Sequence, residues 1–257
     1  MAEMAAFSPD AIALTGDLTN FALPSEFAAA GRFIERLGPP GRVLVIPGNH
    51  DALVRVPEAE GLAHWSPWMR GDGDVPGFPY LRRRGGVALI GLSSAIVTAP
   101  GFAAGALGGA QLERLGTILA RTRAEGLFRL VMIHHPPVGE NNRRGLRDRA
   151  ALLALLAREG AEMLIHGHSH RPALLPLPGR DGRLIPSIGI PPALHGPARR
   201  HPSRWHRYAI SPTEGGWEVE TLVRGISPSQ PGFSTLGRWR MKIEAAPMPG
   251  GFRPPAA

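Results

Sequence analysis

Four short clusters of polar residues, each directly after an apolar run, carry the side chains best suited to metal or acid–base chemistry. "AIAL" (11–14) precedes "TGD", "RVLVI" (42–46) precedes "PGNHD", "LVMI" (130–133) precedes "HHPP", and "EMLI" (162–165) precedes "HGHSH". Carboxylate, amide and imidazole groups bind divalent ions such as Mn, Fe, Zn, Ni or Co. A pair of such ions, about 3.5–4 Å apart, can clamp the attacking and the leaving oxygen of a phosphate ester.

Each cluster also has a structural interpretation when taken alone. "TGD" could be a turn that Asp17 caps, "GNHD" could be an asparagine turn, and one histidine of "HHPP" could be an ordinary core residue. The three histidines of "HGHSH" are harder to explain by packing. Because functional groups gather at the carboxyl ends of strands in open α/β sheets, four clusters in this context predict one shared site.

The apolar runs alternate with helical patterns, which is typical of an α/β domain. A further run, "VALIGL" (87–92), is short enough for a buried strand. Residues 24–38, 109–126 and 146–160 repeat apolar residues at helical spacing, and Ser25 is the expected N-cap of the first of these helices. The sequence therefore predicts buried strands, connected by helices, whose ends bring the polar clusters together.

Two segments lack this periodicity. Residues 61–80 look like a long loop, of a kind that is often functional, although its Trp65 and Trp68 are expected to be buried rather than to stack on a substrate. From about residue 226 the chain is rich in Pro and Gly. We therefore predict one domain over residues 1–225 and a loosely attached tail over residues 226–257.

Composition limits the classes of function. The 29 basic residues against 21 acidic ones give a net charge of +8, which permits a nucleic-acid partner, but no Lys/Arg block favours one. The absence of cysteine excludes disulfides, thiolate metal sites and a cysteine nucleophile. Because no signal-peptide pattern and no apolar run of roughly 18 residues occurs, we expect a cytoplasmic protein without a membrane span.

The motifs "GDLTN", "GNHD", "IHHPP" and "HGHSHR" together resemble the signatures of the calcineurin-like metallophosphoesterase family, in particular its bacterial cyclic-nucleotide-phosphodiesterase-like (class III) branch. The resemblance covers residues from about 11 to 190. It implies an α/β fold in four layers, an α-β-β-α sandwich of two sheets flanked by helices. It also implies a hydrolase with two divalent ions that acts on a small phosphodiester or phosphomonoester.

The same resemblance assigns metal ligands. Asp17 would bridge the two metals, and Asn49, His134 and His168 would complete the second site. His170 would bind the first metal.

The resemblance also implies roles beside the metals. His50 would be the general acid near the leaving group, and Asp51 would orient it. His135 and His166 fall outside the ligand set and are expected to support the ligands or the fold.

The sequence departs from the family at its beginning. The family opens with an Asp-x-His motif that supplies two ligands to the first metal, and no such motif precedes Asp17. Asp10 lies seven residues before Asp17, roughly 23 Å along an extended strand, and so at the wrong end of the sheet. The first metal site is expected to be weakened. We interpret the departure as an N-terminal truncation without the first strand and helix, which leaves apolar surface and unpaired backbone.

Three functions remain open from the sequence. The leading hypothesis is a phosphodiesterase in which a hydroxide between the ions attacks phosphorus, with Arg143 and Arg144 either contacting phosphate or lying in a solvated loop. The alternative is a non-catalytic family member that binds one metal or a phosphorylated ligand. A nuclease is favoured only by net charge. The substrate, the native metals and the oligomeric state stay undetermined.

Overall fold

The largest sheet in the computed structural model has six strands, and the structure describes residues 2–196, 200–227 and 230–245. The strand order is β3-β4-β5-β6-β8-β7, in which β4, β5, β6 and β8 are parallel and the edge strands β3 and β7 are antiparallel. The strands are β3 Tyr80–Arg84, β4 Val87–Gly91, β5 Phe128–Ile133, β6 Met163–His166, β7 Ala173–Pro178 and β8 Leu184–Gly189.

Two smaller sheets form a second layer. The strands β1 (Ile12–Leu14) and β2 (Val43–Val45) pair in parallel. The strands β9 (Arg204–Thr213), β10 (Gly216–Ser227) and β11 (Gln230–Glu244) form an antiparallel sheet in the order β11-β10-β9. Both small sheets face the same side of the large sheet, because one hydrophobic core joins β2, β10 and the inward-facing residues of β4, β5 and β6.

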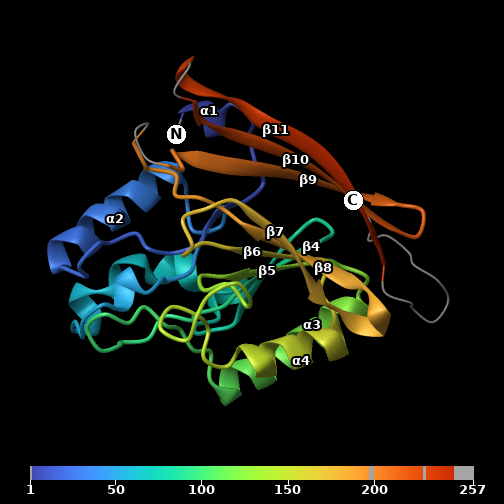
Figure 1. Ribbon diagram of the computed structural model, residues 1–257, viewed down its shortest axis with the longest axis horizontal. Helices are drawn as coiled ribbons and strands as arrows, with labels where there is room; N and C mark the ends of the chain where they lie inside the picture. Colours follow the sequence, from blue (N-terminus) through green and yellow to red (C-terminus); the bar gives the residue numbers. More distant parts are fainter. Residues whose placement is uncertain (1, 197–199, 228–229, 246–257) are drawn as a thin grey trace.

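Helices cover the two outer faces. The helices α3 (Gly109–Ala124) and α4 (Arg149–Glu159) pack on the large sheet (Figure 1). The helix α2 (Pro24–Leu37) packs against β2 in the hydrophobic core that joins the two sheet layers. A short helix, α1 (Ala2–Ala5), precedes β1. The layers are therefore α3 and α4, the large sheet, the small sheets, and α2, which is the predicted four-layer arrangement.

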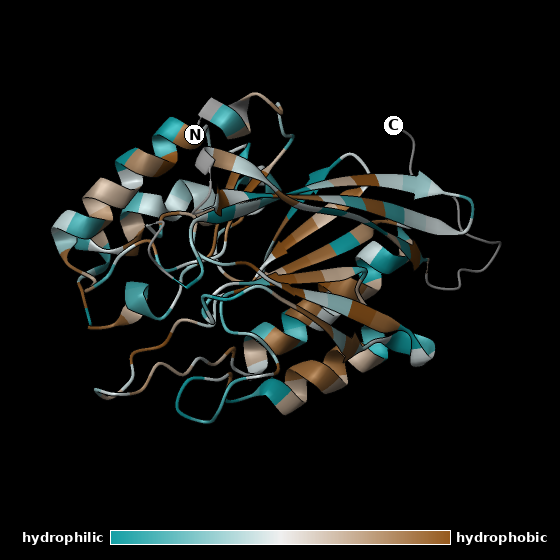
Figure 2. Cartoon of the chain, turned by 45° about the horizontal axis from the view of Figure 1, so that its top comes forward, coloured by the Kyte–Doolittle hydropathy of each residue, from teal (hydrophilic) through white to brown (hydrophobic). Residues whose placement is uncertain are grey.

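The central strands are buried on both faces. In β5, Leu130 and Met132 face the small sheets, whereas Val131 and Ile133 face α3 and α4. Figure 2 shows the strands of the large sheet as mostly hydrophobic. Continuous apolar runs are typical of such parallel strands, and this is why the runs at β2, β4, β5 and β6 predict the strands correctly. The run at β1 also predicts its strand, although the three residues of β1 are only partly buried.

The irregular segment after β2 folds into short 3-10 helices, of which Glu58–Glu60 and Leu62–Met69 pack against α2. Trp65 and Trp68 are buried, and their Nε1 atoms donate to the carbonyls of Phe27 and Gly38 at 3.0 Å each. Their expected burial is confirmed. The expected N-cap Ser25 is wrong, because α2 begins at Pro24, one residue earlier. The 3-10 helices are His50–Ala52, Glu58–Glu60, Leu62–Met69, Asp72–Asp74 and, farther along, Arg180–Gly182.

The predicted tail from residue 226 is wrong for the part that the structure describes. Residues 230–244 form β11, which pairs along β10, and the predicted boundary at residue 225 cuts β10 itself. Gly and Pro are tolerated because β11 is an edge strand, where a missing donor or side chain disturbs only one neighbour. Residues 228–229 and 246–257 lie outside the described residues.

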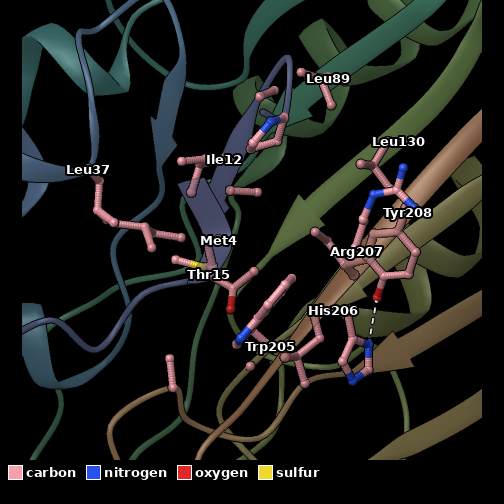
Figure 3. A pocket seen from close by; sticks show the side chains of 18 of the residues that line it. Met4, Ile12, Thr15, Leu37, Leu89, Leu130, Trp205, His206, Arg207 and Tyr208 are labelled. Atoms are coloured by element: carbon pink, nitrogen blue, oxygen red, sulfur yellow. Dashed lines mark hydrogen bonds between the residues drawn. The ribbon is translucent and has the colours of Figure 1, made fainter. Parts of the chain in front are cut away.

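The second layer is interrupted by a cavity. Among the described strands, β1 is bonded only to β2 and β9 only to β10, and a cavity of about 1200 Å³ lies between these two edges (Figure 3). Leu89 and Leu130 of the large sheet contribute to its apolar lining. The expected apolar surface beside β1 is thus present. No helix in the described residues is both long and apolar enough to cross a membrane.

Candidate metal centre

Four predicted ligands meet where strands of two different sheets end. Asp17 and Asn49 follow β1 and β2, whereas His134 and His168 follow β5 and β6. Asp17 and His168 have positive φ angles of 57° and 63°, which non-glycine residues rarely adopt. Such backbone conformations are often found at functional sites, where the surrounding structure enforces them.

The four side chains make a continuous set of short contacts. His134 Nε2 lies 3.1 Å from Asn49 Oδ1 and 3.2 Å from Asp17 Oδ2, and His168 Nδ1 lies 2.8 Å from Asn49 Oδ1. His134 Nδ1 donates to the Thr15 carbonyl at 2.7 Å. Because the carbonyl can only accept, neutral His134 points the Nε2 lone pair at two oxygens. The arrangement therefore requires a proton or a metal ion at that point.

The electrostatics of the cluster also favour a cation. Although burial opposes the charge, His134 holds the pKa of Asp17 well below its ordinary value, and Asp17 in turn raises the pKa of His134. Burial, followed by the neighbouring His134, lowers the pKa of His168 to about 3, so this imidazole is neutral at pH 7. A neutral imidazole and an ionised carboxylate are the forms that bind metals.

The backbone around the cluster leaves no room for other side chains. A Cβ on Gly48 would overlap Asp17 Oδ1 and lie 2.6 Å from the Asp17 nitrogen. Gly16 has a φ of +95°, and a Cβ there would lie 2.7 Å from His134 Nδ1. Two imidazole nitrogens and two oxygens form a donor set for borderline divalent ions. The residues present therefore fit such an ion, which Asp17, Asn49, His134 and His168 would hold.

His170, the predicted ligand of the first metal, lies outside this tight cluster. Its side chain is exposed, its φ is 54°, and its ring packs edge-on against His195 with the centroids 5.2 Å apart. It lines the same cavity as Asp17 and His168. Of the predicted ligands, only Asp17 and His170 are assigned to the first site.

His135 is close to the cluster but is already engaged. Its ligand atom lies within 4.8 Å of those of His134 and His168. Its Nε2 donates to the Ala103 carbonyl at 3.1 Å, and its Nδ1 accepts from the Ser94 hydroxyl at 2.7 Å. Burial lowers its pKa to about 2. His135 therefore packs behind the ligands as a neutral, hydrogen-bonded residue.

His166, the last residue of β6, is also buried, and burial lowers its pKa to about 4. Its Nδ1 lies 3.2 Å from the Gly167 carbonyl.

His50 and Asp51 are placed differently from the prediction. Asp51 was expected to orient the His50 ring, but its two oxygens are occupied by backbone N–H groups of the loops after β1 and β2. The His50 ring instead donates from Nδ1 to the Asn20 carbonyl at 2.7 Å. His50 lines the cavity and leaves Nε2 available to a substrate. The His50 ring is thus oriented by the backbone carbonyl of Asn20, and Asp51 instead holds together the loops after β1 and β2.

Sequence reasoning missed the backbone acceptors and one histidine. The carbonyls of Thr15 and Asn20 fix two imidazole rings, and a carbonyl carries no residue-type signal. His195 follows β8, a strand that the sequence reasoning did not include. Arg144 lies on an exposed loop with its Nε 3.7 Å from Glu140, so a phosphate contact stays a prediction.

Comparisons with known proteins show what the chain is similar to. A family model described as calcineurin-like phosphoesterase matches residues 2–172, more than half of the chain. A probable cyclic nucleotide phosphodiesterase from Synechococcus sp. is 29% identical over 220 residues, which cover 83% of this chain and 76% of that protein. A crystal structure of a dimetal phosphatase from Danio rerio aligns with a TM-score of 0.60 over 95% of this chain and 87% of that one. At 12% identity, that likeness concerns the fold alone.

Proposed function

Because the chain belongs to the calcineurin-like phosphoesterase family, we propose that it is a metal-dependent phosphodiesterase with the cluster after β1, β2, β5 and β6 as its centre. The observation that carries the proposal is the convergence of Asp17, Asn49, His134 and His168 at 2.8–3.2 Å, with a lone pair of His134 aimed at two oxygens. The relative from Synechococcus, whose name is that of a probable cyclic nucleotide phosphodiesterase, supports a diester substrate.

Two divalent ions, of the Mn, Fe, Zn, Ni or Co type, would lower the pKa of a water molecule and offset the charge of the phosphate. As the predicted bridging ligand, Asp17 would contact both ions. Asn49, His134 and His168 would hold the second ion in position. The hydrogen bond from His134 Nδ1 to the Thr15 carbonyl fixes the orientation of that ring before any substrate binds.

In this proposal His50 gives a proton to the leaving oxygen. Its Nδ1–H donates to the Asn20 carbonyl, so a second proton would sit on Nε2, the atom left free for a substrate. The backbone N–H of His50 donates to Asp17 Oδ1 at 2.9 Å, which ties the acid directly to the predicted bridging ligand. This hydrogen bond keeps the backbone of the predicted acid beside the predicted bridging ligand.

The test compares leaving groups. With Mn²⁺ we expect hydrolysis of bis-p-nitrophenyl phosphate and of a 3′,5′-cyclic nucleotide, and slower hydrolysis of p-nitrophenyl phosphate. His50→Ala should lower kcat on the cyclic nucleotide by about 10²–10⁴-fold, because its alkoxide needs a proton. The loss on bis-p-nitrophenyl phosphate should be much smaller, since p-nitrophenolate leaves unprotonated. An equal loss on both substrates would contradict the role of His50 as the acid.

A non-catalytic metal-binding function is the second candidate. It is favoured by the first site, for which the predicted ligands are only Asp17 and His170. If the purified chain binds one ion and hydrolyses neither diester with Mn²⁺, Co²⁺ or Zn²⁺, the binding function replaces the phosphodiesterase.

A further inference from the structure

His195 reaches the edge of the sheet at which the metal centre lies. It follows β8 by six residues, and β8 pairs in parallel with β6, the strand that precedes His168 and His170. Parallel strands end at the same edge of a sheet. His195 therefore lies at the edge where the four polar clusters lie.

The position of His195 is fixed by hydrogen bonds on both its backbone and its ring. Its carbonyl accepts from the N–H and the hydroxyl of the buried Ser203, at 3.2 and 2.5 Å. Its Nδ1 donates to the His201 carbonyl at 3.1 Å, which leaves the lone pair on Nε2. His134 has the same arrangement toward Thr15. A hydrogen bond from the far ring nitrogen to a backbone carbonyl is typical of imidazoles that bind metals.

The spacing between His195 and His170 repeats that of the second site. Their ring centroids lie 5.2 Å apart at an interplanar angle of 86°, and those of His134 and His168 lie 5.2 Å apart at 75°. Two imidazoles on one tetrahedral ion, each about 2.0–2.1 Å from it, have centroids roughly 5 Å apart. Unlike His135, His195 has only one ring nitrogen in a hydrogen bond within the part of the chain that the structure describes. His195, His170 and Asp17 all line one cavity.

We propose that His195 binds the first of the two divalent ions together with His170 and Asp17. Two imidazoles and one carboxylate are a known donor set for catalytic zinc and for non-haem iron, with water in the remaining positions. This inference rests on the proposed function, because it takes Asp17 as the ligand that the two ions share. It gives the first site a third protein ligand in a chain without an Asp-x-His motif.

The test is a titration of the metal-free chain with Co²⁺. Binding is measured by calorimetry and by the visible absorption of the bound ion. We expect two Co²⁺ per wild-type chain. His195→Ala and His195→Gln should keep one tightly bound ion and weaken the other by more than the roughly 10–100-fold that loss of an outer-shell partner costs. The exposed His64, outside the cavity, supplies the control His64→Ala, which should bind both ions as the wild type does.

The outcomes separate this inference from the proposed function. If both His195 variants bind two ions with unchanged affinity, the 5.2 Å pair is only a ring contact and the inference is wrong, while the second site stands. If the wild type binds a single ion that Asp17→Asn removes, the first site is absent and the inference is also wrong. If the wild type binds no ion, the proposed function itself falls.

Discussion

At the scale of single residues, Asp51 fixes the relative position of the two loops that carry Asp17 and Asn49. Its carboxylate accepts from the backbone N–H groups of four residues at 2.8–2.9 Å, namely Asp17, Leu18, Thr19 and Gly48. It also accepts from the Thr19 hydroxyl at 3.0 Å. A buried carboxylate with five donors is a strong anchor, because charge-assisted hydrogen bonds are stronger than neutral ones.

Asp51→Asn should weaken both the fold and the metal centre. The new NH₂ group donates rather than accepts, so it faces N–H groups that lose their acceptor. With a cost of about 1–3 kcal/mol for each unsatisfied group, the free energy of unfolding should fall by roughly 2–5 kcal/mol. Urea unfolding and a metal titration measure the two effects. The exposed Asp10 provides the control Asp10→Asn. Equal results for the two variants would show that Asp51 is no anchor.

Asp51 also shows what could be predicted at this scale. The residue types Asp17, Asn49, His134 and His168 indicate metal chemistry, and strand-end placement predicts that they meet. The adjacency of His50 and Asp51 in the sequence does not say where either side chain points. The 3-10 turn at His50–Ala52 separates them, so the backbone donors that surround Asp51 could not be inferred from residue types.

At the scale of elements, a buried ion pair joins β5 and β6, the strands that precede the predicted ligands His134 and His168. Arg129 in β5 contacts Glu162, just before β6, through Nη2 at 2.7 Å and Nε at 2.8 Å. The backbone N–H of Arg129 donates to the same carboxylate at 2.6 Å. Nη1 donates to the carbonyls of Glu159 and Gly160 at the end of α4. The pair therefore ties α4 to the strands β5 and β6, at whose far ends His134 and His168 lie.

Glu162→Gln should be strongly destabilising. The substitution leaves the Arg129 charge buried without a counter-charge, which costs about 3–5 kcal/mol of unfolding free energy. Glu220→Gln removes the exposed pair with Arg240, at 3.0 Å, and should cost less than about 1 kcal/mol. Both values come from urea unfolding at neutral pH. A loss below about 1 kcal/mol for Glu162→Gln would mean that the buried pair does not hold these strands together.

The elements also differ in how well the sequence predicts them. Apolar runs predict β2, β4, β5 and β6, because these strands lie in the interior of the fold, and they also predict β1, whose three residues are partly buried beside the cavity. The strand β9 has no such run, since most of its side chains are only partly buried. Pro176 in β7, Pro186 in β8 and Gly237 in β11 are further residues that argue against a strand when only local preference is considered.

At the scale of the whole molecule, the metal centre is a junction between the two sheet layers. Asp17 and Asn49 come from the small sheet, and His134 and His168 come from the large one. The four-layer order follows from the family resemblance. The division of the second layer by the cavity does not follow from that resemblance. It depends on which edges of β1 and β9 remain unpaired in three dimensions.

A junction of this kind predicts that metal binding stabilises the whole domain rather than one loop. An ion that binds only the folded chain adds about 4 kcal/mol at a concentration 1,000 times its Kd. For a chain of this size each kcal/mol raises Tm by roughly 2–4 °C, so calorimetry should show a single transition shifted upward by about 8–16 °C, and EDTA should reverse it. Asp17→Asn should abolish most of the shift, because Asp17 is the predicted bridging ligand and its carboxylate contacts His134 across the layers. An undiminished shift in Asp17→Asn would place the stabilising ion elsewhere, and a separate early transition would mean that the layers unfold independently of the centre.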